Sequence, residues 1–254
     1  MIFRKFLMFA SRNAIPKFTL EVKSDNAGTS GTDQFTIPTT AGTYLYDYTT
    51  SDGQSGTGLT GATTITFASG AGTYEIYITG TFPRIYFNNA GDKLKLLRVL
   101  EWGDYGVGAT NQTGAFHGCT NLSSIAADCD NINLITTASN MFRDCGSLST
   151  LPSTLTLNSL ITGNIMFYFV YVLTDLPIGM TLPNLLDGSN MFTGSTINTT
   201  RYSQLLVDLE SGNANNSVTF HGGNSLYNAT GETARNILTG VGRTWTITDG
   251  GLEP

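Results

Sequence analysis

The first third of the chain alternates between apolar and polar residues. The alternation holds over Lys17 to Val22, Gln34 to Pro38, Thr43 to Tyr48, Thr63 to Phe67 and Thr73 to Thr79. A period of two residues is typical of strands that bury one face, and segments rich in Gly, Ser and Asp separate these runs. The pattern predicts a small β-sandwich at residues 15–84.

A regular repeat of aromatic and aliphatic residues occupies residues 85–197. The anchors are Phe116, Phe142, Phe167 and Phe192, separated by 26, 25 and 25 residues, and a leucine follows six residues after the first three, at Leu122, Leu148 and Leu173. This period lies within the roughly 20 to 29 residues of leucine-rich repeats. A single coil of that kind cannot bury its own apolar side, so we expect these seven side chains to align into one core. Regular spacing of this kind favours packing over a cofactor or ligand box. The repeat predicts a leucine-rich-repeat solenoid of about four coils.

The last segment, residues 198–254, changes to a helical pattern. Apolar residues at helical spacing over Tyr202 to Glu210 predict a short helix that ends at Gly212, and Thr233 to Leu238 predicts a second one. Short strands are expected at Val218 to Phe220 and at Thr244 to Thr248. These elements predict an α+β cap over the end of the solenoid, in a protein that is mainly β with short helices.

The first 14 residues are basic and aromatic. Their start resembles an export signal, but the apolar stretch from Phe6 to Ala10 is shorter than the roughly 7 to 15 residues that such a signal needs, and Arg12 interrupts it. We expect an arm, carried by Phe3, Arg4, Lys5 and Phe6, that docks into a neighbouring subunit. A first sandwich strand or a frayed terminus is the alternative. The sequence contains no run of 18 apolar residues, so it predicts no membrane span.

The amino-acid composition limits the classes of partner that this protein can bind. Only 13% of the residues are charged, and 13 basic against 19 acidic residues give a net charge of -6. A phosphate backbone requires a basic surface, so nucleic acid is not an expected partner.

Cysteine and histidine give no pattern of a metal or cofactor site. The three cysteines are Cys119, Cys129 and Cys145, and the first and last occupy equivalent repeat positions, which favours packing as small apolar residues. A disulfide between them stays open. His117 and His221 are far apart in sequence and no CxxC pair occurs, so neither a metal nor a cofactor is expected.

The repeat units at residues 116–122 and 141–152 resemble those of BspA-type leucine-rich-repeat surface proteins, over residues 86–197. The lead-in at residues 87–103 is similar to that of members from bacteriophages and Bacteroidetes-type bacteria, in which it follows a β-sandwich like the polycystic-kidney-disease or immunoglobulin-like domain. Thr50-Ser51-Asp52-Gly53 stands where such sandwiches carry Trp-Gly-Asp-Gly. Residues 245–251 resemble terminal segments of phage tail and fibre proteins.

The resemblance implies adhesion or virion architecture, with no catalytic set. Since virion proteins need no export signal, it favours a structural protein on the surface of a phage particle, such as a tail or head fibre that binds a receptor. The implied partners are other virion proteins and a host surface glycan or protein, with the chain present as a homo-oligomer or in many copies. A bacterial cell-surface adhesin is the alternative.

An enzyme that degrades glycans is a second alternative. Glycoside hydrolysis needs two carboxylates in a cleft, and the carboxylates available are Asp128 with Asp130, Asp144, and Asp175 with Asp187. None of them lies in a supporting motif, and no Gly-x-Ser-x-Gly turn accompanies the histidines. We therefore expect no enzyme and no catalytic residue.

Overall fold

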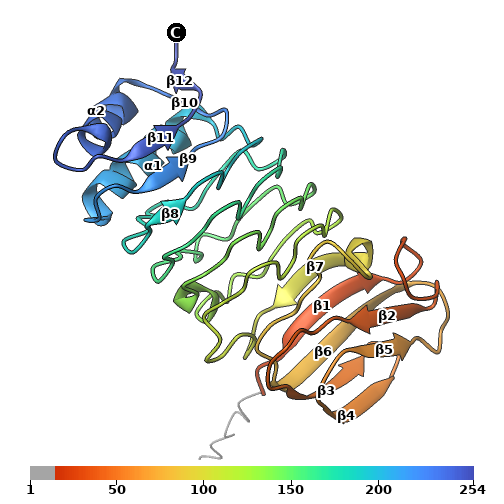
Figure 1. Ribbon diagram of the computed structural model, residues 1–254. Coiled ribbons are helices and arrows are strands. Elements are labelled where there is room, and N and C mark those ends of the chain that lie inside the picture. Colours follow the sequence, from red (N-terminus) through yellow and green to blue (C-terminus); the bar gives the residue numbers. More distant parts are fainter. Residues whose placement is uncertain (1–14) are drawn as a thin grey trace, which may run out of the picture.

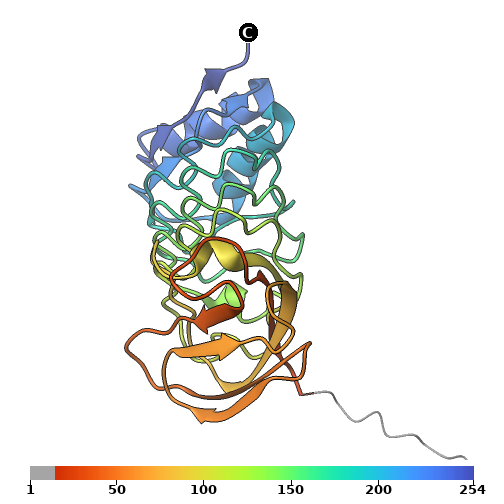
Figure 2. The ribbon, with the colours of Figure 1, turned by 90° about the vertical axis from the view of Figure 1, so that its right-hand side faces the viewer.

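The computed structural model describes residues 15–254, which form an elongated molecule (Figure 1). A β-sheet region lies at one end, two helices lie at the other, and a series of stacked turns joins them. The view turned by 90° shows the same order along the long axis (Figure 2). The predicted docking arm, with Phe3, Arg4, Lys5 and Phe6, lies outside the described residues.

The N-terminal end is built on a five-stranded antiparallel sheet with the order β4-β3-β6-β1-β7. Its strands are β1 (Phe18–Lys23), β3 (Leu45–Thr50), β4 (Ser55–Leu59), β6 (Thr73–Thr81) and β7 (Leu96–Glu101). A separate antiparallel pair is formed by β2 (Gln34–Ile37) and β5 (Thr63–Thr66). Since β7 follows residue 84, the sheet includes chain from beyond the predicted sandwich.

A buried charge cluster fixes the loop after β1 against the segment that leads into β7. Lys95, at the end of the 3-10 turn η1 (Lys93–Lys95), is 0% exposed, and its ammonium donates to Ser30 Oγ (2.8 Å) and to the carbonyl of Gly31 (2.7 Å). Asp92 is 1% exposed and accepts from the backbone N–H groups of Ser30 (3.0 Å) and Thr36 (2.7 Å). Buried charges are tolerated when they are paired and hydrogen-bonded, so this cluster joins the sheet to the rest of the chain.

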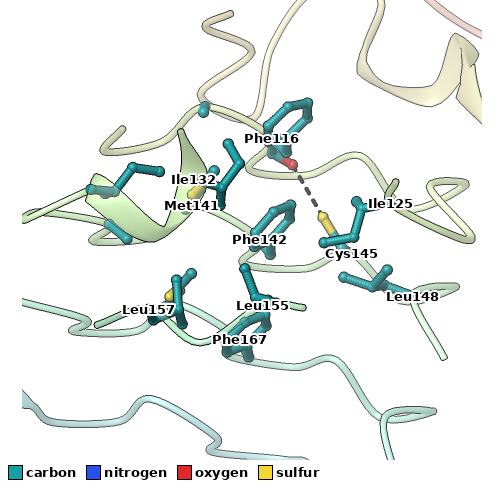
Figure 3. Close-up of a cluster of buried hydrophobic side chains, with 14 of the residues drawn as sticks. Phe116, Ile125, Ile132, Met141, Phe142, Cys145, Leu148, Leu155, Leu157 and Phe167 are labelled. Atoms are coloured by element: carbon teal, nitrogen blue, oxygen red, sulfur yellow. Dashed lines mark hydrogen bonds between the residues drawn. The ribbon is translucent and has the colours of Figure 1, made fainter. Parts of the chain in front are cut away.

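The anchor phenylalanines lie one above another in the core, and Figure 3 shows the first three of them, Phe116, Phe142 and Phe167. Neighbouring rings are stacked, with centroids 5.3, 5.6 and 5.3 Å apart. The backbone follows the same order: the N–H of Phe116 donates to Met141 O, that of Phe142 to Met166 O and that of Phe167 to Met191 O, each at 2.9 Å. All four rings and the three leucines are fully buried; these residues are Phe116, Phe142, Phe167, Phe192, Leu122, Leu148 and Leu173.

The predicted fold class, with a leucine-rich-repeat solenoid of about four coils, is wrong. Such a solenoid adds a strand from every coil to one continuous sheet. Here no strand lies between the end of β7 and the start of β8 (Asp187–Gly188), a stretch described throughout, which holds only the 3-10 turn η2 (Ile132–Leu134). Single parallel bridges join consecutive repeats, at Asn111, Thr137, Thr162 and Asp187. The sheets of the molecule are separate, and none is closed or continues from coil to coil. We refer to residues 102–186 as the stacked-turn region.

Left-handed backbone conformations interrupt the chain on both sides of every anchor. In every repeat, two residues with positive φ flank the anchor, two positions before it and two after it. They are Gly114 and Gly118, Asn140 and Asp144, Ile165 and Phe169, and Asn190 and Gly194, with φ between 55° and 88°. Each such residue turns the chain away from the extended conformation, so no strand runs through an anchor.

The C-terminal end contains two helices and short strands. The elements are α1 (Thr199–Gly212), β9 (Thr219–His221), β10 (Leu226–Tyr227), α2 (Ala229–Thr239), β11 (Thr246–Thr248) and β12 (Gly251–Leu252). The side chains of Asn198 and Asn228 cap the helices by accepting backbone N–H groups of their first turns. Phe220 of β9 packs edge-on against Phe192 with centroids 6.1 Å apart, and thereby covers the last anchor. Among residues 15–254, no helix has the length and apolar character needed to cross a membrane.

Candidate functional site

One side of the stacked-turn region presents polar and aromatic side chains directly after each buried anchor. The position after the anchor holds His117, Arg143, Tyr168 and Thr193, all partly exposed. We define the binding strip as Lys93, His117, Arg143, Asp144, Tyr168, Phe169 and Tyr171. Backbone hydrogen bonds hold its turns in register: the N–H of Gly118 donates to Arg143 O (2.8 Å) and the N–H of Asp144 to Tyr168 O (2.9 Å). Side chains from successive repeats therefore lie side by side.

The first half of the binding strip is cationic. His117 Nε2 lies 3.3 Å and Arg143 Nε 3.4 Å from the same oxygen, Oδ2 of Asp144. Neither nitrogen makes a hydrogen bond, although both atoms are buried. A Cβ on Gly118 would come within 2.9 Å of Lys93 Cδ, so the stem of this lysine lies over the glycine. The ammonium of Lys93 donates to the carbonyl of Asn89 (3.1 Å), and the Asp144 carboxylate lies beside His117 and Arg143.

The imidazole of His117 is held toward its neutral form. Burial lowers the pKa of His117 from its ordinary value of 6.5, and the charge of Arg143 lowers it further, while Asp144 acts in the opposite direction. The positive charge of this half therefore comes mainly from Lys93 and Arg143 at neutral pH.

The second half of the binding strip is aromatic. The ring centroids of Tyr168 and Phe169 are 4.0 Å apart, and those of Phe169 and Tyr171 are 5.2 Å apart and stacked. The guanidinium of Arg143 lies over the Tyr168 ring, 5.2 Å from its centroid, which joins the two halves. Tyr171 is 59% exposed. A Cβ on Gly194 would lie 2.7 Å from the Phe169 ring, so a glycine is needed beneath it.

The aromatic half uses residues that its backbone disfavours. Ile165 and Phe169 have φ of 57° and 58°, whereas the second repeat has Asn140 and Asp144 at the same positions. Asn and Asp tolerate this conformation far better than a β-branched or bulky side chain does. The third repeat thus combines local strain with an exposed aromatic cluster.

The residues predicted as the repeat core are not part of this site. The four anchors and three leucines lie in the interior, one residue or more away from the strip. No prediction singled out Arg143, Tyr168 or Phe169. The signal available was the position after each anchor, which changes from repeat to repeat while the anchor does not.

Four of the five carboxylates considered for glycan cleavage, Asp128, Asp144, Asp175 and Asp187, have partners within the fold, and Asp130 is exposed. Asp128 accepts from the backbone N–H groups of Trp102 and Gly103, both at 2.9 Å. Asp175 lies 3.2 Å from Arg201 Nε, and Asp187 accepts from Ser189 N–H (2.9 Å). Within the described part of the chain, no group of three or more His, Cys, Asp or Glu side chains is placed to hold a metal ion.

The three cysteines are buried free thiols. Cys145 Sγ donates to the carbonyl of Phe116 (3.2 Å), the dashed contact in Figure 3. Burial raises the pKa of all three thiols, that of Cys129 to about 11. They remain protonated at neutral pH and act as small core residues.

Comparison with known proteins gives no relative. No protein family matches this chain, and no curated protein or solved structure is significantly similar to it. The resemblance to BspA-type proteins stays a prediction, and the binding strip is interpreted from its own geometry.

Proposed function

We propose that this protein is a structural and adhesive component of a bacteriophage surface, such as a tail or head fibre, and that the binding strip contacts the host receptor. The observation that carries the proposal is the strip itself, in which cationic and aromatic side chains stand partly exposed on a backbone that is hydrogen-bonded in register. Aromatic and arginine side chains are enriched at the centres of binding surfaces because they bury large areas at little entropic cost.

The support beneath the strip favours binding without rearrangement. The anchors directly before Arg143 and Tyr168 are fully buried and stacked, so the backbone that carries these two residues is fixed on its inner side. A surface that is ordered before the ligand arrives loses little conformational entropy on binding. This arrangement suits an adhesive protein.

The strain at Ile165 and Phe169 supports a function for the aromatic half. Residues in sparsely populated conformations reduce stability by about 1 to 3 kcal/mol each and are found mainly where function requires them. The other repeats have glycine, asparagine or aspartate at the same places. Two buried core leucines, Leu157 and Leu182, also have positive φ, so the support comes from Ile165 and Phe169 standing beside an exposed aromatic cluster rather than from strain alone.

The elongated shape suits an appendage. The described chain begins at the end formed by the sheet, and the helical end lies opposite (Figure 1). Attachment through the sheet end would leave the side of the stacked-turn region, and with it the strip, open to a receptor.

Two measurements test the proposal. Mass spectrometry and immunogold microscopy of purified phage particles should find the chain on the particle surface. The purified chain should also compete with the particles for host cells, and Arg143→Gln should weaken that competition. Detection in the bacterial envelope alone would instead support the cell-surface adhesin.

A further inference from the structure

We infer that the binding strip takes an anionic glycan, with the acidic group beside Lys93, His117 and Arg143 and a sugar ring against Tyr168 and Phe169. This inference rests on the proposed function and names the chemical class of the receptor. The acidic group can be a carboxylate or a sulfate, because both present several acceptor oxygens to a guanidinium or an ammonium.

The charge of the strip is opposite to that of the whole chain. Lys93 and Arg143 contribute two positive charges and Asp144 one negative charge, which leaves +1 with His117 neutral, whereas the chain carries -6. Asp144 makes no hydrogen bond to His117 Nε2 or Arg143 Nε, so the cations are only partly compensated. A local positive field within an acidic protein attracts an anionic group of a ligand to this place on the surface.

The guanidinium of Arg143 has donors left for a ligand. Its Nη1 donates to Asn140 Oδ1 (3.3 Å), and Nη2 donates to no acceptor among the described residues. The side chain is 36% exposed. An acidic group placed at its outer edge completes these bonds.

The aromatic half adds a face for a sugar ring. The C–H groups on one side of a pyranose carry small positive charges and lie favourably against the negative face of an aromatic ring. Arg143 is 5.2 Å from the Tyr168 centroid on the neighbouring turn, so an acidic substituent and the ring that bears it fit adjacent turns. Tyr and Arg also supply hydroxyl and N–H groups that bond sugar hydroxyls.

Two other ligands fit less well. A single-stranded nucleic acid requires positive charge that follows its backbone, and the strip is cationic only at one end. An apolar peptide would offer no acceptor to Arg143 Nη2, and covering this charged group without a partner is unfavourable when it loses water.

The test uses the full chain, three glycans of defined charge and oligo(dT). Biolayer interferometry should detect binding to polygalacturonate, to dextran sulfate or to both, and not to neutral dextran. Binding to polygalacturonate alone assigns a carboxylate, and binding to dextran sulfate alone assigns a sulfate. Equal binding to neutral dextran, or stronger binding to oligo(dT) than to either charged glycan, overturns the inference.

Matched variants locate the ligand. Arg143→Gln and Tyr168→Leu should each weaken binding at least about tenfold, since each removes one of the two proposed contacts. Lys17→Gln is the control: this lysine lies over the Tyr77 ring at 5.0 Å on the N-terminal sheet, remote from the strip, and its loss should leave the Kd unchanged. Lys93→Gln provides a second charge variant if Arg143→Gln lowers the melting temperature. Unchanged affinity in folded Arg143→Gln, Tyr168→Leu and Lys93→Gln overturns the inference.

The two proposals fail in different ways. If no glycan binds but Arg143→Gln still weakens competition for host cells, the anionic-glycan inference is wrong and the adhesive function stands. If the chain is absent from phage particles but binds polygalacturonate through Arg143 and Tyr168, the virion proposal is wrong and the glycan inference stands.

Discussion

The second and third repeats have the same backbone and different surfaces. Both place a buried phenylalanine between two left-handed residues, and their rings stack at 5.6 Å. The second repeat fills the left-handed positions with Asn140 and Asp144, which suit them, whereas the third uses Ile165 and Phe169, which do not. The comparison teaches that the third repeat has given up local stability for an aromatic surface.

The largest expected effect concerns what the two repeats share. Phe142→Ala and Phe167→Ala should each reduce the free energy of unfolding by about 3 to 5 kcal/mol, because each leaves a cavity between two stacked rings. Urea denaturation followed by circular dichroism measures this change. A melting curve unaltered by either substitution would contradict the stacked core.

An exchange of residues between the repeats should move stability in opposite directions. Asn140→Ile should lower the free energy of unfolding by about 1 to 2 kcal/mol, because it places a β-branched residue in the left-handed region. Ile165→Asn should raise it by up to about 1 kcal/mol, since the relief of strain is partly offset by lost apolar contact. Changes of the same sign in both variants would show that the backbone conformation does not decide the difference.

Phe169→Asp separates stability from binding. This substitution installs the residue that the second repeat has at the same position, so we expect the free energy of unfolding to change by less than about 1 kcal/mol. Loss of the Phe169 ring, which packs between Tyr168 and Tyr171, should nevertheless abolish most binding to cells. Full binding by a stable Phe169→Asp chain would assign the aromatic cluster a structural role.

The smallest expected effect is a change of stability with pH that comes from the titration of His117. The pKa of His117 is lowered by burial and next by Arg143, so between about 6.5 and the folded-state pKa the unfolded chain binds more protons than the folded chain. Stability therefore falls as the pH decreases through this window, and His117→Gln should make melting less sensitive to pH between 7 and 5. His221, whose pKa burial also lowers, contributes with the same sign and remains in that variant.

An NMR titration gives the matching control. Arg143→Gln should raise the pKa of His117, because it removes the nearby positive charge, and should leave that of His221 unchanged. An unshifted His117 would contradict the proposed charge coupling within the strip.

Some parts of this structure could be predicted from the sequence and others could not. The period of the phenylalanine anchors can be read directly, because it depends only on which side chains are apolar. It says nothing about whether the backbone between anchors is extended, and that is why the solenoid prediction was wrong. Ile165 and Phe169 are residue types that favour strands. Their left-handed conformation is seen only in the structure, where both donate hydrogen bonds to the neighbouring turn.

Two features had no local signal. Lys95 and Ser30 are 65 residues apart, and neither segment has a sequence pattern that predicts the buried hydrogen bond between the Lys95 ammonium and Ser30. The binding strip likewise gathers Lys93 and one to three residues from each of three repeats, so it exists only once their register is known. Of the aromatic run from Phe167 to Tyr171, only Phe167 was assigned a role from the sequence, as an anchor.

Each buried anchor is followed directly by a residue on the outer side of the turn, and this arrangement affects which substitutions the protein can accept during evolution. In consecutive repeats Phe116, Phe142 and Phe167 are constant, while the next residue is His117, Arg143 and Tyr168. Since one residue faces the interior and its neighbour faces solvent, the outer one can be exchanged without repacking the inner one. Where the strip binds a receptor, as proposed, specificity can thus change one repeat at a time, by single codon changes at positions outside the stacked core.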